Sequence, residues 1–326
     1  MTATSGSIRF NTDSSKLEIY NGEKWWEIDS TSSEEQTGGT RGVWASGNNP
    51  TYFSERMIAN IATTGNAVDF GHLIRDKNSA YGSASRTRGI TFGGYDGSSR
   101  LAEIDYFDMG TDATAQDFGD CNNNTSAVNP SGNQTRMIAA GGYQPSCLAT
   151  IDYITISATG STKDFGDLTY GSKTSSSHYN SSTRGIMAGG GCPSATANNQ
   201  YLTISTLGNT LAFGDSTTSA TGAAGMGGNA IRGIGWKATS VIEYVTIATL
   251  GNALDFGDAT VNGFNGGGVC SSPTRSVVAG GYNSSSNQNW MNYVQIMTTG
   301  NSIDFGDLPR VLSSVGGVSN GHGGLG

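Results

Sequence analysis

The chain has 326 residues with a formal net charge of −8, and only 13% of its residues are charged. It lacks the basic stripe that nucleic-acid binding needs and the run of ~20 apolar residues that spans a bilayer, so we expect neither nucleic acid nor membrane insertion. Glycine supplies 49 residues and aromatic residues make up 9%, which predicts a folded, turn-rich β protein rather than an aromatic-poor disordered chain.

Residues 1–30 form a short separate segment that carries three β runs, at Ile8–Asn11, Leu17–Tyr20 and Trp25–Ile28. The Asn21-Gly22 pair between the last two runs is a strong hairpin signal. A segment of about thirty residues is too small to bury a core of its own. We therefore expect its aromatic residues to bind a partner surface, and the candidate attachment residues are Phe10, Tyr20, Trp25 and Trp26.

Three features of this segment, at Gly6–Thr12, Leu17–Tyr20 and Gly22–Trp25, resemble a small module found near the ends of tailed-bacteriophage virion proteins, especially tail fibres. The resemblance implies a protein that is made in the host bacterial cytoplasm and is located in the virion. It also implies that the segment binds other virion proteins and that the chain forms homo-oligomers in the assembly. A polar stretch follows and predicts a linker over residues 31–40.

Residues 41–326 contain six repeats, five of which end in Asp-Phe-Gly and one in Ala-Phe-Gly. Successive phenylalanines are 48, 47, 48, 43 and 49 residues apart, and an Ile or Tyr stands twelve residues before each of them. The phenylalanines are Phe70, Phe118, Phe165, Phe213, Phe256 and Phe305. An arginine recurs with the same rhythm, at Arg41, Arg88, Arg136, Arg184, Arg232 and Arg275.

Each repeat reads as four short β-strands, as the third repeat illustrates. Its expected strands are 125–128, 136–140, 151–156 and 163–167, and the third of these alternates strictly between apolar and polar residues. Four short strands at a period in the forties are typical of propeller blades. We expect the recurring Tyr and Phe side chains to pack between blades, where small residues of the first strands surround the centre.

The double Gly after the second strand and the aromatic residues on the third and fourth strands resemble the kelch repeat. The resemblance implies an all-β, six-bladed kelch-like β-propeller, although Phe stands where kelch repeats have Trp on the fourth strand. The chain ends after a first-strand pattern at Val311–Gly317, before the next Arg is due. We therefore expect this C-terminal strand to complete the blade that begins at Arg41 and so to close the ring.

The recurring motifs have structural interpretations that we favour over chemical ones. Asp-Phe-Gly lacks the other kinase motifs, and the Asp residues around it are expected to pair with the repeated Arg residues rather than to bind metal. Cys121, Cys147, Cys192 and Cys270 include no C-x-x-C pair and are expected to be free thiols. We expect no cofactor, no metal and no catalytic residues.

The loops between the second and third strands vary most among the repeats, and variable loops on a rigid ring are where binding is usually found. The candidate ligand-binding residues are exposed aromatics that could stack on sugar rings: Tyr95, Tyr143, Trp236, Tyr282 and Trp290. These features favour a tail fibre or receptor-binding protein that contacts a host-surface glycan and is not an enzyme. A capsid or tail decoration protein and a glycan-processing enzyme remain as alternatives.

Overall fold

The computed structural model describes residues 3–11, 16–28, 39–173, 179–190, 192, 194–220, 225–262 and 264–325. The chain divides into two compact units, Met1–Gln36 and Thr37–Gly326, which we call the N-terminal and C-terminal units. Most of the predicted linker 31–40 lies outside the described residues. Within the described residues, no helix has the length and apolar character needed to cross a membrane.

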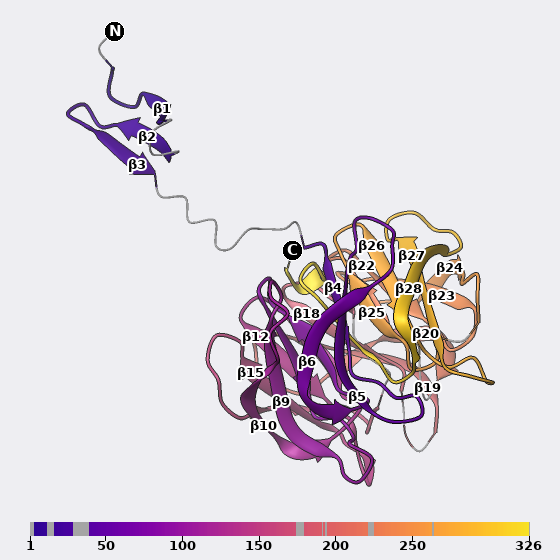
Figure 1. The fold of residues 1–326 in the computed structure, drawn as a ribbon. Coiled ribbons are helices and arrows are strands. Elements are labelled where there is room, and N and C mark those ends of the chain that lie inside the picture. The colour runs from indigo at the N-terminus through magenta and orange to yellow at the C-terminus, as the bar shows by residue number, and fades with distance from the viewer. Residues whose placement is uncertain are drawn as a thin grey trace. The chain divides into compact units, whose positions relative to one another are not determined.

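The N-terminal unit is a three-stranded antiparallel sheet of β1 (Ile8–Asn11), β2 (Lys16–Tyr20) and β3 (Trp25–Ile28), in that order (Figure 1). These strands confirm the three β runs expected from the sequence. The predicted hairpin turn joins β2 to β3, and the Asn21 side chain accepts hydrogen bonds from the N–H groups of Glu23 and Lys24, each at 2.9 Å. Gly22 has a φ of 103°, which a side chain would strain.

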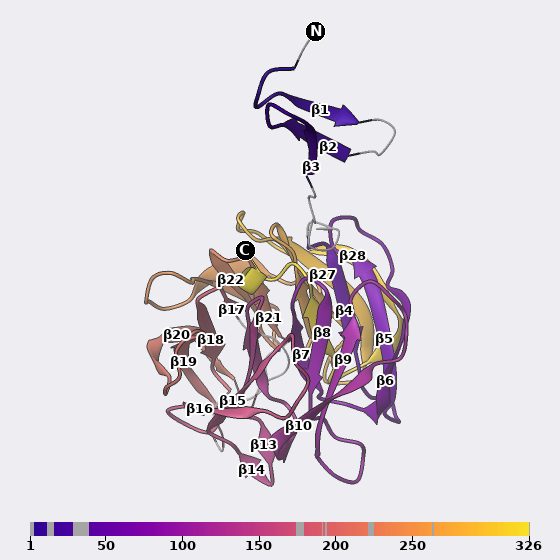
Figure 2. The same cartoon turned by 90° about the vertical axis from the view of Figure 1, so that its left-hand side faces the viewer.

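The described part of the C-terminal unit contains six four-stranded antiparallel sheets, which we number 1 to 6 from the N-terminus (Figures 1 and 2). We call the strands of each sheet first to fourth along the sheet order, and the first strand is the one that contacts the first strands of the neighbouring sheets. The first strands are β29 (Gly316–Ser319), β7 (Tyr81–Ala84), β11 (Asn129–Gly132), β17 (Tyr179–Asn180), β21 (Met226–Gly228) and β25 (Gly268–Ser271). The second strands are β4 (Arg41–Ala45), β8 (Arg88–Phe92), β12 (Arg136–Ala140), β18 (Arg184–Ala188), β22 (Arg232–Trp236) and β26 (Arg275–Ala279).

The outer half of each sheet consists of the third and fourth strands. The third strands are β5 (Phe53–Asn60), β9 (Leu101–Asp108), β15 (Thr150–Thr155), β19 (Thr196–Thr203), β23 (Val241–Thr246) and β27 (Gln288–Gln295). The fourth strands are β6 (Val68–Lys77), β10 (Gln116–Thr125), β16 (Lys163–Asp167), β20 (Leu211–Ala220), β24 (Leu254–Asp258) and β28 (Ile303–Leu312). A two-stranded hairpin, β13 (Tyr143–Gln144) with β14 (Ser146–Cys147), and a 3₁₀ turn, η1 (Gly323–Leu325), complete the described elements.

Strands two to four of the third repeat lie within a residue of their expected bounds, but the expected first strand is wrong. Thr125 ends the preceding fourth strand, and β11 begins four residues later than expected. The reason is a crossing segment with a left-handed residue, Ala127 at a φ of 56°, which ends extended structure before the first strand begins. Ser79 and Ser314, with φ values of 52° and 56°, stand at the same place before β7 and β29.

The C-terminal strand completes the first sheet, as the sequence predicted. β29 pairs antiparallel with β4, from Gly316 opposite Ala45 to Ser319 opposite Gly42. The strand itself is Gly316–Ser319 rather than Val311–Gly317, because residues 311 and 312 extend the outermost strand of sheet 6. The first sheet therefore joins residues from both ends of the C-terminal unit.

The first strands lie against one another in the order β29, β7, β11, β17, β21 and β25, and β25 contacts β29 again. Their small residues permit this approach. A Cβ on Gly317 would lie 2.2 Å from the carbonyl oxygen of Val269 in the neighbouring sheet, so no larger side chain fits without a shift. The arrangement is consistent with a β-propeller.

The core of the C-terminal unit is distributed between neighbouring sheets rather than gathered at one centre. Each of its apolar clusters joins two consecutive sheets, and one joins sheet 6 to sheet 1 through residues such as Phe305 and Met57. Phe165, 2% exposed, packs between sheets 3 and 4 and meets the ring of Tyr153 edge-on at 6.0 Å. The expectation that the repeated Tyr and Phe residues pack between sheets is therefore confirmed at this position.

The repeated arginines join consecutive sheets, but not through carboxylates as the sequence suggested. Arg136 lies over the ring of Tyr153 in its own sheet, at 4.5 Å, and its Nη1 donates a 2.8 Å hydrogen bond to the carbonyl of Ile204 in the next sheet. The expected Arg–Asp pairing is wrong because the guanidinium meets a strand-end carbonyl instead. The six equivalent bonds are Arg41 to Met109, Arg88 to Ile156, Arg136 to Ile204, Arg184 to Ile247, Arg232 to Ile296 and Arg275 to Ile61.

The Phe-Gly repeat forms a second joint at the outer edge of the sheets. The carbonyl of Phe165 accepts a 2.8 Å hydrogen bond from the N–H of Gly208, in the turn between the third and fourth strands of the next sheet. A Cβ on Gly166, which has a φ of 147°, would lie 2.5 Å from the carbonyl oxygen of that same turn glycine. The bond between Gly65 and Phe305 repeats this contact from sheet 6 to sheet 1. Exposed strand edges are covered in this way.

Candidate functional site at the loop end of the sheets

The strands of every sheet run between two ends that differ in character. At one end, which we call the turn end, a turn joins the first strand to the second and another joins the third strand to the fourth. The opposite end, the loop end, carries the loops between second and third strands. Their described residues are 46–52, 93–100, 141–149, 189–190, 192, 194–195, 237–240 and 280–287. The variable residues noted in the sequence belong to the loop end.

A Gly-Gly-Tyr sequence places three of the candidate ligand-binding residues at the loop end in the same way. The N–H groups of Tyr95, Tyr143 and Tyr282 donate hydrogen bonds of 2.9, 2.8 and 2.9 Å to carbonyls of the segment that enters the first strand of their sheet. The preceding glycines have positive φ values in all three cases, so the chain turns sharply and presents the tyrosine beyond the sheet. The three rings are half-buried or exposed.

Tyr95 and Tyr143 belong to a continuous row of aromatic and cationic side chains that we call the Tyr–Arg row. Tyr52 meets Tyr95 edge-on at 5.7 Å between ring centroids, and the Arg100 guanidinium lies 5.5 Å from the ring of Tyr95. The same guanidinium lies 4.3 Å from the ring of Tyr143, and the Lys173 ammonium lies 4.5 Å from that ring. The row crosses the loop ends of sheets 1 to 3, and all five side chains are partly accessible.

Tyr282 stands in a separate, neutral recess of about 490 Å³ that we call the Tyr282 pocket. Its ring is 41% exposed. The lining includes hydroxyl and amide side chains from the loops of sheets 5 and 6, among them Ser240, Asn262 and Asn283, and no charged residue. Amide and hydroxyl groups beside an accessible ring are suited to the hydroxyls and the apolar faces of a sugar.

The two candidate tryptophans do not behave as exposed loop residues. Trp236, 1% exposed, packs against Phe264 and its indole N–H donates a 3.1 Å hydrogen bond to the hydroxyl of Ser276. The expectation that Trp236 is exposed is therefore wrong, because the residue ends a second strand and points into the core. Trp290 is half-buried and packs against the same apolar cluster.

The loop end also holds a disulfide bond, between Cys147 and Cys192, that the sequence interpretation missed. Their Cα atoms are 5.9 Å apart, a separation typical of disulfides. The bond ties the β13–β14 hairpin of sheet 3 to the corresponding loop of sheet 4. Free thiols were expected at all four cysteines, and this is wrong for these two. Cys121 and Cys270 are free and buried, and burial raises the pKa of both thiols.

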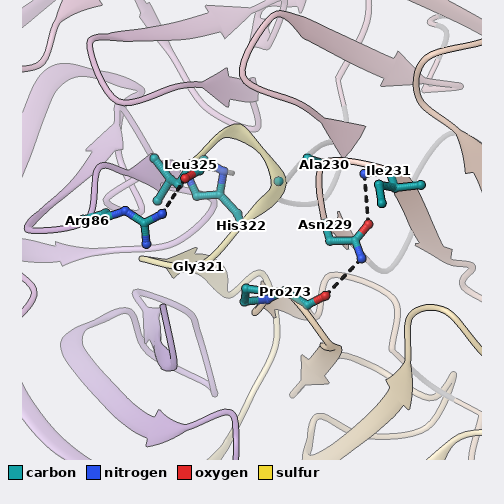
Figure 3. Close-up of a pocket in the computed structure, with 9 residues that line it drawn as sticks. Arg86, Asn229, Ala230, Ile231, Pro273, Gly321, His322 and Leu325 are labelled. Atoms are coloured by element: carbon teal, nitrogen blue, oxygen red, sulfur yellow. Dashed lines mark hydrogen bonds between the residues drawn. The ribbon is translucent and has the colours of Figure 1, made fainter. Parts of the chain in front are cut away.

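At the turn end, the C-terminal tail lies across several sheets and borders a cavity of about 260 Å³ (Figure 3). His322 is buried, and its Nε2 lies 2.7 Å from the carbonyl of Ala84 while its Nδ1 lies 3.2 Å from the amide nitrogen of Asn180. Arg86 donates a 2.6 Å hydrogen bond to the carbonyl of Leu325 (Figure 3). Burial lowers the pKa of His322 to about 4, so the imidazole is neutral and structural at neutral pH.

The C-terminal unit also buries ion pairs that the sequence did not reveal. Lys77 contacts Asp105 at 2.5 Å, and Lys237 contacts Glu243 at 2.6 Å. Burial raises the pKa of Asp105 to about 6. These groups face other protein atoms between sheets and are not open to a ligand. Among the described residues, no group of three His, Cys, Asp or Glu side chains could hold a metal ion.

The candidate attachment residues of the N-terminal unit lie on two different faces of its sheet. Phe10 and Trp26, 61% and 52% exposed, share one face with Ile8 and Ile19, because Ile8, Ile19 and Trp26 are opposite one another in register. Tyr20 and Trp25 lie on the other face, where Trp25 packs beneath Arg9 at 4.2 Å. The first face is therefore apolar and open within this unit, and the second is covered by its own side chains.

A scan against protein-family models and a search of curated proteins both found no match for this chain. The assignment of a function therefore depends on the geometry described above.

Proposed function

We propose that the C-terminal unit is a six-bladed, kelch-like β-propeller closed between sheets 6 and 1. Three independent cycles of contacts support closure. The first strands contact one another in an order that returns to its start, the repeated arginines bond each sheet to the next, and the apolar clusters do the same. A closed ring leaves no outer sheet without a neighbour, which explains why the last repeat bonds to the first.

The function that we infer is that of a bacteriophage virion protein, a tail fibre or receptor-binding protein, whose propeller binds a host-surface glycan. The observation that carries this proposal is the set of partly accessible tyrosines at the loop end, fixed in place by the same backbone bonds in three repeats. A rigid ring with variable, aromatic loops at one end is suited to recognition, and nothing in its loop chemistry requires a catalytic step.

The N-terminal unit supplies the attachment to other virion proteins in this proposal. Its open face presents Ile8, Phe10, Ile19 and Trp26, which a partner subunit in the assembly would cover. Apolar patches of this kind are typical of protein interfaces. Within the C-terminal unit, Gly39 lies against Gly321 of the C-terminal tail, at the turn end.

Two experiments on the full-length protein test this proposal. Immunogold labelling of purified virions should place the protein at the tail, whereas label over the capsid would favour a decoration protein. Added full-length protein should compete with virions for adsorption to host cells. A protein that neither binds cells nor slows adsorption is not the receptor-binding protein, and shortening of the surface polysaccharide would indicate an enzyme instead.

A further inference from the structure

The Tyr–Arg row places two positive charges at the loop end of an acidic protein. The protein carries a formal net charge of −8, yet two cations of the row, Arg100 and Lys173, have no carboxylate within ion-pair distance among the described residues. Two other exposed cations, Arg75 and Arg310, are by contrast paired with glutamates. The only partners described for Arg100 and Lys173 in the row are the faces of tyrosine rings.

Two polar atoms at this row are buried without any hydrogen-bond partner, namely the Nε of Arg100 and the Oε1 of Gln144. Gln144 follows Tyr143 in the β13–β14 hairpin, so the donor and the acceptor belong to the same part of the row. A buried polar group without a partner destabilises a protein, and such groups in native proteins need an explanation. The protein by itself therefore leaves part of the polar chemistry of this row unsatisfied.

The two carboxylates nearest in sequence to Arg100, those of Glu103 and Asp96, already have partners. Glu103 pairs with Arg75 and Lys77. Asp96 accepts hydrogen bonds of 2.8 Å from the N–H groups of Ser98 and Ser99. These bonds lower the pKa of Asp96 and hold the carboxylate in its own turn. The Arg100 guanidinium is therefore left to the tyrosine rings and to whatever approaches from solvent.

The loop that carries Tyr143 and Gln144 is held in place before any ligand arrives. It folds back as a short hairpin, in which Gln144 pairs with Ser146, and Cys147 ties it to the next sheet through the disulfide. The backbone bond from Tyr143 to Ser126 fixes its other side. Rigid loops lose less conformational entropy on binding, which favours affinity.

Resting on the function proposed above, we infer that the Tyr–Arg row binds an acidic saccharide, with Arg100 and Lys173 contacting a carboxylate or phosphate group. Guanidinium donors match the oxygens of both anions, and the tyrosine rings pack against sugar faces. The described lining of the Tyr282 pocket is uncharged, so this pocket offers no cation to an acidic group.

The test measures binding of the full-length protein to three immobilised polymers: polygalacturonate, poly(glycerol phosphate) and neutral dextran. We expect binding to one or both anionic polymers, weakened by salt, and no comparable binding to dextran. The two anionic polymers distinguish a carboxylate from a phosphate. The variant with R100Q and K173Q together should bind the anionic polymer at least about tenfold more weakly, a loss of one to two charge-assisted hydrogen bonds.

K163Q is the control for the loss of one positive charge. Lys163 is an exposed lysine on a fourth strand away from the row, and K163Q changes the net charge by as much as R100Q or K173Q alone. Thermal unfolding of each variant checks that the fold is kept, and K173Q alone serves if R100Q disturbs it. Wild-type protein that binds neither anionic polymer, an R100Q/K173Q variant that binds as tightly as wild type, or an equal loss in K163Q would each overturn the inference. A variant that no longer binds the polymer but still competes for host-cell adsorption would support the proposed function and assign receptor binding to another part of the loop end.

Discussion

The turn end and the loop end of the same six sheets follow different rules. At the turn end, an arginine of every sheet bonds to a carbonyl of the next sheet, and in sheets 2 to 6 it also lies over a tyrosine ring. At the loop end, one repeat has a disulfide-tied hairpin, another a neutral pocket and a third only a short connection. The contacts that repeat build the frame, and the residues that depart from the repeat are therefore the ones to examine for function.

The largest effect should come from removing the strand that joins the two ends of the C-terminal unit. Deleting residues 316–326 removes β29, the partner of β4 and the neighbour of β7 and β25. We expect insoluble or protease-sensitive protein, because three strands lose packing and one edge becomes open. Soluble yield and thermal unfolding measure this, with a deletion of residues 1–28 as the control, which should leave the unfolding of the larger unit unchanged. A tail deletion that unfolds normally would show that the sheets do not depend on this closure.

A single side chain of the repeat should also be costly. Phe165→Ala should destabilise the protein by roughly 3–5 kcal/mol, because the ring is buried between sheets 3 and 4 and the cavity is closed on both sides. Leu211→Ala is the control, since Leu211 is exposed on a fourth strand and should change stability by less than about 0.5 kcal/mol. Urea unfolding measures both. A cost below about 1 kcal/mol for Phe165 would contradict packing between sheets.

The sequence revealed the parts of this fold that repeat and hid those that do not. The spacing of Arg136 and Phe165 located three strands of the third repeat, and the pairing of β29 with β4 followed from the early end of the last repeat. The first strands were misplaced because small residues fill both the crossing segment and the strand, and only the left-handed backbone at Ala127 separates them. The order of small residues along the chain does not show where the backbone becomes left-handed.

The candidate site was only partly predictable, for a related reason. Gly-Gly-Tyr recurs and located Tyr95, Tyr143 and Tyr282 at one end of the sheets. Trp236 is just as aromatic and just as close to a loop, but it ends its strand on the inward side. The disulfide between Cys147 and Cys192 and the stacking of Arg100 depend on which loops are neighbours across sheets, which spacing along the chain does not encode.

Breaking the disulfide tests whether it stabilises the loop end, which lacks the repeated arginine bonds of the turn end. Cys147→Ser should destabilise the protein by about 2 kcal/mol, in line with the loss of a disulfide from a folded domain. Alkylation in denaturant without reductant should label only Cys121 and Cys270, and reduction should raise the number of labelled thiols to four. Labelling of all four cysteines before reduction, in protein purified from an oxidising medium, would show that the bond does not form. Cys121→Ser, at a buried free thiol, separates loss of the bond from loss of a buried sulfur.

Acid should weaken the turn end through His322. Its pKa is lowered to about 4 in the folded protein, against 6.5 for an unburied histidine, because burial disfavours the charged ring. The stability that this group contributes is therefore present above pH 6.5 and is lost as the pH falls towards 4, by about 3 kcal/mol in total. Urea unfolding between pH 7 and pH 4 measures this slope. His322→Gln, which does not titrate, should flatten it, and an unchanged slope in that variant would assign the effect to other groups.

The smallest effect that still separates the two ends is the loss of one repeated arginine. Arg136→Ala removes the stack on Tyr153 and the 2.8 Å bond to Ile204, so we expect a cost of about 1–2 kcal/mol. Arg136→Lys keeps the charge but not the planar stack with its directed N–H, and it should recover less than half of that cost. Lys173→Ala removes a cation that touches a ring at the loop end and makes no bond to a neighbouring sheet's carbonyl among the described contacts, so it should cost less than about 0.5 kcal/mol. If Lys173→Ala lowers the free energy of unfolding as much as Arg136→Ala, the Tyr–Arg row stabilises the fold as the repeated arginines do. The two ends would then not differ in the way described above.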